Sequence, residues 1–176
     1  MKDCAHCGRP FEPFLTTGRV CSTVCALRWV RGEKLRERAQ VRQRREALKP
    51  RAKWLAECQA IVNKYVRLRD KDLPCCSCDR PASWDGQWHA SHFRSVGAAT
   101  GLRFHLWNIH KGCSICNNHL SGNLAGYWPR ILAKLGQEKL DWLEAQNAVT
   151  RYPEEYLKRF KLVMGKKLRR KERASQ

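Results

Sequence analysis

The residues best suited to chemistry are cysteines that occur in closely spaced pairs. Zinc prefers four sulfur ligands in a tetrahedron, and two or three residues between cysteines let one turn of backbone direct both thiolates at one ion. Eight of the ten cysteines form such pairs, which predicts two structural zinc sites. The first site comprises Cys4, Cys7, Cys21 and Cys25, and the second comprises Cys75, Cys78, Cys113 and Cys116.

The two remaining cysteines have structural interpretations. Cys58 lies on the apolar stripe of a predicted helix, which places it in the core. Cys76 adjoins Cys75, but the two-residue spacer before Cys78 favours Cys75 as the ligand. Free buried thiols or a redox pair are the alternative for any one pair. Four such pairs in one chain favour metal binding.

Histidines and asparagines are concentrated between and directly after the halves of the second cysteine set. They include His89, His92, Asn108, His110, Asn117 and His119. A zinc ion bound by the four cysteines would draw these residues together. A histidine can take a proton from water as a general base, while a divalent cation held by oxygen and imidazole ligands stabilises charge on a phosphate. The set favours phosphodiester cleavage, whereas a lone histidine would more simply be a core residue bonded to the backbone.

Three of these positions resemble the signature of the HNH (ββα-metal) nuclease family. That signature has a histidine on the first strand, an asparagine before the second C-x-x-C pair, and Asn or His directly after it. The matching residues are His92, Asn108 and Asn117. The resemblance implies that His92 is the general base, that Asn108 orients it or shapes the loop, and that Asn117 binds a catalytic Mg²⁺ or Mn²⁺. Asn108 also has a structural interpretation as a turn former.

One position departs from that signature. Most HNH enzymes place an acidic or histidine metal ligand directly before the general base, and here that residue is Ser91. His89 is the replacement that we favour, although strand alternation puts it on the face opposite to His92 unless a bulge intervenes. His119 follows Asn117 within one helical turn, so it is a further candidate to bind the catalytic ion or a phosphate.

Longer strings resemble the NinG/Rap recombination endonucleases of lambdoid phages. They include Leu73-Pro74-Cys75-x-x-Cys78, Asn108-Ile109-His110-Lys111-x-Cys113 and Cys116-Asn117-x-His119-x-Ser121-Gly122-Asn123-Leu124. The similarity extends over most of the chain, including the N-terminal cysteines and a basic helix. It implies structure-specific cleavage of Holliday junctions and displacement loops during phage recombination in the cytoplasm of the bacterial host. Recombination proteins are further candidate partners.

The charge of the chain independently favours a polyanionic partner. Its 176 residues carry a formal net charge of +19. Such a field attracts nucleic acid above all, with an acidic membrane surface as the weaker alternative, and it is atypical of an ordinary metabolic enzyme. We recognise no secretory signal and no apolar stretch long enough to span a membrane, so we expect a cytosolic protein without a membrane partner.

The basic residues are concentrated in two segments that flank the cysteine- and histidine-rich region. We expect them to bind DNA phosphates with little sequence preference, although a solvated helix face is the simpler interpretation of an isolated charge run. The candidate contacts are Arg36, Arg38, Arg42, Arg44 and Arg45 in the first segment, Lys166, Lys167, Arg169 and Arg170 in the second, and Lys111 between them.

These patterns predict a mostly helical α+β chain, in which a small zinc-stabilised ββα-metal (HNH) core is flanked by long helices and preceded by a separate zinc finger. Strands are expected at Gln87–Phe93 and Arg103–His110, with a helix from Cys116. The predicted divisions are a four-cysteine finger (1–27), a basic helical linker (28–50), an amphipathic helix (51–72), the nuclease core (73–126), C-terminal helices (127–165) and a basic tail (166–176).

The main functional hypothesis is a metal-dependent endonuclease that acts on branched DNA, with two structural zinc ions and a catalytic Mg²⁺ or Mn²⁺. Because resolving a junction takes two symmetric nicks, we expect a homodimer. The alternative is a zinc-finger protein that binds nucleic acid without cutting it, and a zinc protein that binds structured RNA is a third possibility. The set of His92, Asn108 and Asn117 favours the nuclease, since a pure binding protein does not need it.

Overall fold

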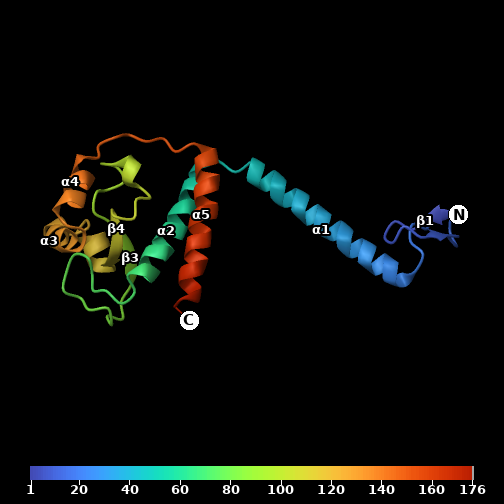
Figure 1. Cartoon of the computed structure of the whole chain (residues 1–176), viewed down its shortest axis with the longest axis horizontal. Coiled ribbons are helices and arrows are strands. Elements are labelled where there is room, and N and C mark those ends of the chain that lie inside the picture. Colours follow the sequence, from blue (N-terminus) through green and yellow to red (C-terminus); the bar gives the residue numbers. More distant parts are fainter. Residues whose placement is uncertain (176) are drawn as a thin grey trace. The chain divides into compact units, whose positions relative to one another are not determined.

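The computed structural model describes residues 1–175, which divide into two compact units (Figure 1). One unit spans Met1–Lys49, and the other begins at Pro50. The secondary structure is mostly helical, with two small two-stranded sheets. The predicted α+β class is confirmed at this level. None of the helices in the described part of the chain combines the length and the apolar composition needed to cross a bilayer.

The first unit contains a short hairpin followed by a long exposed helix. Strands β1 (Lys2–Asp3) and β2 (Pro10–Phe11) pair antiparallel, and helix α1 spans Thr23–Ala47. Ser22 caps this helix, because its hydroxyl accepts a hydrogen bond from the Cys25 amide at 3.2 Å. No residue of α1 is buried. The helix ends before Pro50, since a proline disfavours helical conformation in the residue that precedes it.

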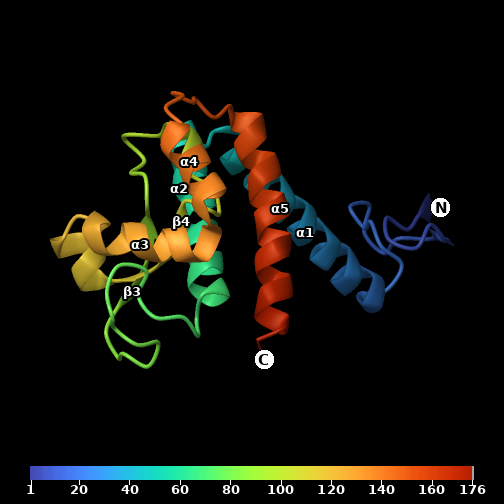
Figure 2. The same ribbon diagram turned by 60° about the vertical axis from the view of Figure 1, so that its left-hand side comes forward.

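Two long helices form the main core of the second unit. Helix α2 (Arg51–Arg69) and helix α5 (Glu154–Arg173) lie side by side (Figure 2). The buried residues on α2 include Trp54, Cys58 and Val62, at the spacing that predicted an amphipathic helix. Cys58 is fully buried, as expected, and its thiol lies 3.4 Å from the Leu157 carbonyl on α5. Helix α5 continues to Arg173, so most of the basic segment after residue 165 is helical.

The second sheet pairs strand β3 (Trp88–His92) with strand β4 (Ile109–Cys113) in a regular antiparallel register. The first predicted strand is confirmed, but the prediction of a strand at Arg103–His110 is wrong. Residues in this segment use their amides in local turns, with the His105 amide bonded to Leu102 and the Asn108 amide bonded to His105. Because those amides are already paired, they are not free for a sheet ladder until Ile109.

The helix expected from Cys116 is interrupted after one turn. A single π-helical turn spans Ile115–His119, and positive φ angles at Ser121 and Asn123 then redirect the chain. Helix α3 begins only at Leu124 and ends at Leu135, and helix α4 (Gln137–Ala145) follows. These two helices contribute to a second core. Its members are Phe93, Ala99, Leu102, Tyr127, Ile131, Leu140 and Leu143.

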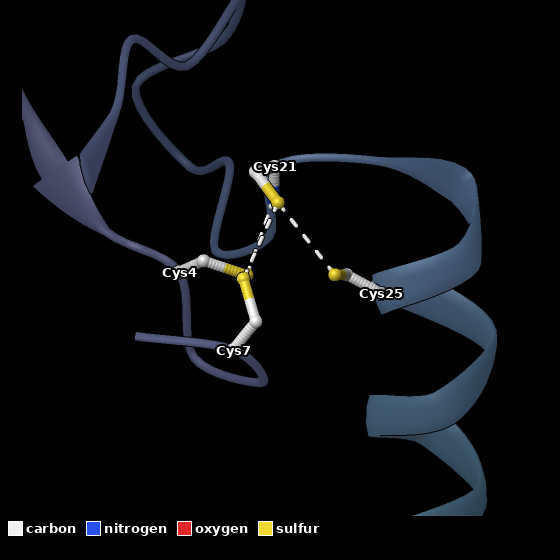
Figure 3. A group of neighbouring side chains, drawn as sticks. All are labelled: Cys4, Cys7, Cys21 and Cys25. Atoms are coloured by element: carbon white, nitrogen blue, oxygen red, sulfur yellow. Dashed lines mark hydrogen bonds between the residues drawn. The ribbon is translucent and has the colours of Figure 1, made fainter. Parts of the chain in front are cut away.

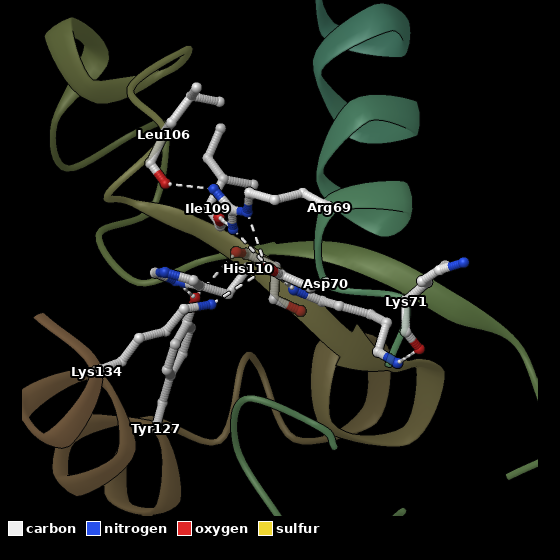
Figure 4. A network of polar contacts seen from close by, with 10 residues as sticks. Arg69, Asp70, Lys71, Leu106, Ile109, His110, Tyr127 and Lys134 are labelled. Carbon is white, nitrogen blue, oxygen red and sulfur yellow. Dashed lines mark hydrogen bonds and ion pairs between the residues drawn. The ribbon is translucent and has the colours of Figure 1, made fainter. Parts of the chain in front are cut away.

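A buried carboxylate connects the end of α2 to β4 and α3 (Figure 4). Asp70 is 3% exposed, lies 2.6 Å from the Arg69 guanidinium and 3.2 Å from the Lys134 ammonium, and accepts the Lys111 amide. Arg69 also donates to the carbonyls of Leu106 and Ile109. Burial raises the pKa of Asp70, but hydrogen bonds and charges from Arg69 and Lys134 outweigh it and hold this pKa below the usual value.

Replacing Asp70 with asparagine is expected to lower the free energy of unfolding by about 3–5 kcal/mol, because two cations lose their buried partner. Since the folded pKa of Asp70 is lowered, this stabilisation is present at neutral pH and is lost as the pH falls through the folded value. Urea denaturation of the zinc-loaded chain measures the difference. Asp79→Asn is the matched control, because its side chain is 99% exposed where it meets Arg130. Equal losses in both variants would contradict the prediction.

Candidate functional site

The first four-cysteine cluster joins the N-terminal hairpin to the start of α1 (Figure 3). The sulfurs of Cys4, Cys7, Cys21 and Cys25 all lie within 4.8 Å of one another. In a tetrahedral zinc–thiolate site with bonds of about 2.3 Å, the sulfur–sulfur edges are about 3.8 Å long. The Cys21 sulfur lies 3.6 Å from that of Cys7 and 3.6 Å from that of Cys25. The cluster therefore has the size of a zinc site.

The second cluster gathers sulfurs from the loop before β3, the end of β4 and the π-helical turn. Its members are Cys75, Cys78, Cys113 and Cys116, and the Cys78 and Cys113 sulfurs are 3.8 Å apart. Backbone amides point at these sulfurs, with the Cys113 amide 3.2 Å and the Ser77 amide 3.4 Å from Cys75 Sγ. The Arg80 guanidinium donates to Cys78 Sγ at 3.3 Å. Such donors stabilise thiolates, which are the form that binds zinc.

The electrostatics of the second cluster also fit a bound cation. A hydrogen bond from Cys76 and the amides of Cys113 and Ser77 lower the pKa of Cys75 to about 4. Burial and hydrogen bonds from Cys78 and Cys113 raise the pKa of Cys116 to about 12. One thiolate therefore forms readily, whereas a complete set of four needs a positive ion among them. Both clusters could hold zinc, in agreement with the predicted ligand sets.

A hydrogen-bonded group of polar side chains lies beside the second cluster, where β3 meets the π-helical turn. Ser91 donates its hydroxyl hydrogen to Asn117 Oδ1 at 2.8 Å, and Asn117 Nδ2 lies 3.3 Å from His89 Nδ1. His89 and Ser91 are two residues apart on a regular strand, so they share one face. Strand alternation, which separates His89 from His92, is therefore what brings His89 next to Asn117. Gly112 makes room for this group, because a Cβ there would collide with the Ser91 hydroxyl.

This group borders a hollow of about 460 Å³. The lining residues are Asn63 and Arg67 of α2, Gln87, Trp88, His89 and Ala90 on and before β3, and Asn117. None of them is acidic, and Arg67 carries the one permanent charge in this lining. Together these side chains offer one guanidinium, one imidazole and three amides. They can bind an anion directly, while Asn117 and His89 supply an oxygen and an imidazole for a cation.

His92, the last residue of β3, lies on the other face of the strand. Its Nε2 is 3.0 Å from the Arg103 carbonyl, and burial lowers the pKa of His92 below the usual value for histidine. The loop that presents this carbonyl is held by Asn108, which is fully buried. The Asn108 amide group donates to the carbonyls of Arg94 and Leu102, and its oxygen accepts the Arg94 amide hydrogen. Asn108 thus fixes the shape of the loop that contacts His92.

The chain matches a known family over almost its whole length. A family model described as "Bacteriophage Lambda NinG protein" matches residues 1–174. The chain belongs to the NinG family. Protein ninG of Escherichia phage lambda is 43% identical over 126 residues, which are 72% of this chain and 61% of that protein. Protein ninG of Salmonella phage P22 is 41% identical over 126 residues, again 72% of this chain and 61% of that protein.

The matched region of this NinG-family chain thus spans about three fifths of the length of those relatives. No solved structure matches the chain. The predicted membership of the NinG family is confirmed, whereas catalysis and the HNH assignment stay predictions.

The remaining predicted site residues of the NinG-family chain lie in three different surroundings. His119 is exposed at the end of the π-helical turn. The predicted arginine contacts on α1 and the basic contacts on α5 are exposed, as phosphate-binding side chains must be. Lys111 differs, because it is 3% exposed, donates to the Lys71 carbonyl at 2.8 Å and lies 4.1 Å from the Trp88 ring centroid. Its predicted contact with DNA is therefore not supported by its position.

Sequence reasoning did not find the contributions of Asn63, Arg67 and Gln87 to the hollow. The sequence predicts α2 only as an amphipathic helix that packs on a core. The position of Arg67 beside β3 depends on how that helix crosses the sheet. The sequence does indicate that Asn63 and Arg67 share one face of α2, because they are four residues apart. His110 takes a structural role, since its Nδ1 lies 2.9 Å from the Tyr127 hydroxyl and burial lowers its pKa to about 3.

Proposed function

We propose that this NinG-family chain is a metal-dependent endonuclease that cuts branched DNA, such as Holliday junctions and displacement loops, during phage recombination. The observation that carries the proposal is the hydrogen-bonded group of His89, Ser91 and Asn117 on one face of β3, directly before His92. This arrangement supports an HNH-type ββα core, in which a zinc-bound cluster holds a hairpin against a helical turn.

His92 is suited to the role of general base. If its Nε2 carries the proton, that nitrogen donates to the Arg103 carbonyl, which leaves Nδ1 free to accept a proton from water. Because burial lowers the pKa of His92, the imidazole stays neutral at neutral pH, as a base must. Asn108 orients His92 indirectly, by holding the loop that contains Arg103.

Asn117 and His89 would hold the catalytic ion. Asn117 Oδ1 accepts the Ser91 hydroxyl hydrogen and retains a second lone pair for a cation. Ser91 would thus act by positioning Asn117. A bound Mg²⁺ or Mn²⁺ would stabilise the negative charge that develops on the phosphate and on the leaving oxygen.

Because β3 is an edge strand, side chains on its two faces can contact the same substrate. Side chains on successive residues of a strand point to opposite faces. A phosphodiester that lies along an exposed edge is within reach of both, so it can approach His92 from one face and the group of His89 and Asn117 from the other. The β3 residues that line the hollow, Trp88, His89 and Ala90, come from both faces of the strand.

The basic helices would supply affinity for the arms of the DNA. Helix α1 exposes Arg36, Arg38, Arg42, Arg44 and Arg45, and α5 exposes Lys166, Lys167, Arg169 and Arg170. Contacts of this kind neutralise phosphates without reading bases, so binding would weaken steeply with salt. A homodimer would provide the two nicks that resolution of a four-way junction needs.

The test is cleavage of a labelled four-way junction and of its linear duplex arms by the zinc-loaded chain. With Mg²⁺ or Mn²⁺ we expect paired nicks in the junction and at least about tenfold slower cutting of the duplex, because only the branched substrate occupies both sites of a dimer. Omitting the divalent ion from a metal-depleted buffer should abolish cutting without loss of zinc. Tight junction binding without cutting under either metal would overturn the nuclease proposal.

That outcome would favour a second candidate, a NinG-family protein that binds branched nucleic acid without catalysis. The observation in its favour is the neutral hydroxyl of Ser91, because a site without a carboxylate holds a divalent ion weakly. Competition between junction DNA and structured RNA in the same binding assay would then identify the preferred nucleic acid.

A further inference from the structure

The hollow beside β3 differs from an ordinary cation site in the charges that surround it. Metal sites for Mg²⁺ normally include carboxylates. The lining here contains no carboxylate, and it contains the guanidinium of Arg67. A positive charge that is permanent at all pH values repels a divalent ion and attracts an anion. The hollow as it stands is therefore better suited to a phosphate than to a bare metal ion.

Among Lys64, Arg67 and Arg69 near the end of α2, Arg67 alone forms no ion pair with the described residues. Lys64 pairs with Glu172 at 2.6 Å, and Arg69 pairs with Asp70 at 2.6 Å. Arg67 has no hydrogen bond or ion pair to any residue between 1 and 175, although it is only partly exposed. Its neighbours on the rigid strand and helix are amide and imidazole groups, which can add hydrogen bonds to an oxyanion.

The placement of these groups is fixed by packing. Helix α2 is anchored by its buried face against α5 and the sheet, so Asn63 and Arg67 project from one rigid surface. Asn63 is further held by the Gln59 side chain, whose Nε2 donates to its oxygen at 2.8 Å. A planar guanidinium held in this way can bind two oxygens of one phosphate at once.

We propose that the hollow is a phosphodiester-binding site with Arg67 as its cationic ligand, and that DNA phosphate occupies it without a divalent ion. This inference rests on the proposed function, because it names the group that holds the substrate beside His89 and Asn117. The phosphate would bring the negative charge that the lining lacks. With that charge in place, a divalent ion that Asn117 would help to hold would bind the complex more tightly than it binds the free protein.

The experiment uses the full zinc-loaded chain, labelled for NMR, in buffer without added divalent ions. Thymidine 3′,5′-bisphosphate is titrated in at constant ionic strength, and thymidine is the probe without phosphate. We expect a saturable shift of the His89 ring and Asn117 side-chain signals with the bisphosphate alone. In Arg67→Gln the affinity should fall about tenfold or more, since a charge-assisted hydrogen bond is lost.

Arg51→Gln is the matched control, because it removes an exposed arginine from the first turn of the same helix. It should bind the bisphosphate as the wild type does. Arg67→Lys keeps the charge but loses the planar fork, so it should bind with intermediate affinity. Thermal melting and zinc content establish that each variant is folded. Unchanged affinity in Arg67→Gln, or no saturable shift in the wild type, would overturn the inference.

The same variants separate this inference from the proposed nuclease function. If the wild type binds the bisphosphate through Arg67 but cuts no junction with Mg²⁺ or Mn²⁺, the phosphate site stands and the nuclease proposal fails. If the wild type cuts junctions and Arg67→Gln cuts them with the same KM and kcat, the nuclease proposal stands and the phosphate site fails.

Discussion

Replacing His92 with alanine is expected to slow metal-dependent nicking of a four-way junction by about 10²–10⁴-fold, the usual contribution of a general base. Junction affinity should change by less than about twofold, because phosphate contacts from the basic helices supply most of the binding. The physical reason is the environment of the imidazole, which is kept neutral by burial and oriented by the Arg103 carbonyl. Single-turnover cleavage and fluorescence anisotropy measure the two quantities.

His6→Ala is the matched control for this variant, because His6 is an exposed histidine in the N-terminal unit. It should cut at the wild-type rate. Asn108→Ala offers a second comparison, since it should reduce the rate by releasing the loop around Arg103 and not by removing the base. A His92→Ala protein that is folded, retains its zinc and nicks within threefold of the wild type would exclude His92 as the base.

Removing zinc from the second cluster is expected to unfold the hairpin and the π-helical turn. A structural zinc site contributes on the order of 10 kcal/mol, which is comparable to the whole stability of a typical domain. Cys113→Ser should therefore lose one zinc and much of the stability of the second unit, because Cys113 is fully buried at the end of β4. Zinc content by mass spectrometry and thermal melting by circular dichroism provide the measurements.

The adjacent thiol supplies a sharp control for that experiment. Cys76 lies next to Cys75 but outside the four-sulfur group, so Cys76→Ser should retain both zinc ions. The ring centroids of Trp84 and Trp88 lie 5.3 Å apart beside the cluster, and their fluorescence should change in Cys113→Ser alone. If Cys76→Ser lost zinc and Cys113→Ser kept it, the assignment of the ligands would be wrong.

The elements that could be predicted from sequence are those whose pattern is local. Cysteine spacing identified both clusters, and apolar spacing identified α2, because these signals depend only on neighbours along the chain. The strand expected at Arg103–His110 was wrong for the opposite reason. Its amides are satisfied by local turns, and the buried Asn108 side chain donates to the carbonyls of Arg94 and Leu102 across this loop. Composition does not distinguish such a loop from a strand.

In the candidate site, too, residue types could be predicted from the sequence, but their three-dimensional neighbours could not. The imidazole of His89 suits a metal ligand, but strand alternation places it on the face opposite to His92. The structure places Asn117 on the same face as His89, so these two side chains can act together. Arg67 has no sequence motif at all. It belongs to the hollow because α2 packs across β3, and this tertiary arrangement brings together residues more than 20 positions apart in the chain.

The two sulfur clusters differ in their access to solvent, and this difference would set the order in which they lose bound zinc. Cys7 and Cys21 are exposed, whereas Cys75, Cys113 and Cys116 are buried. A chelator or an oxidant attacks a sulfur that it can reach, so an ion bound by the N-terminal cluster would exchange faster than an ion bound beside β4. With zinc in both clusters, partial demetallation would therefore release the N-terminal finger first, while the hairpin, the hollow and His92 would stay in place. Oxidation of the thiols would be expected to affect the N-terminal unit before the second cluster.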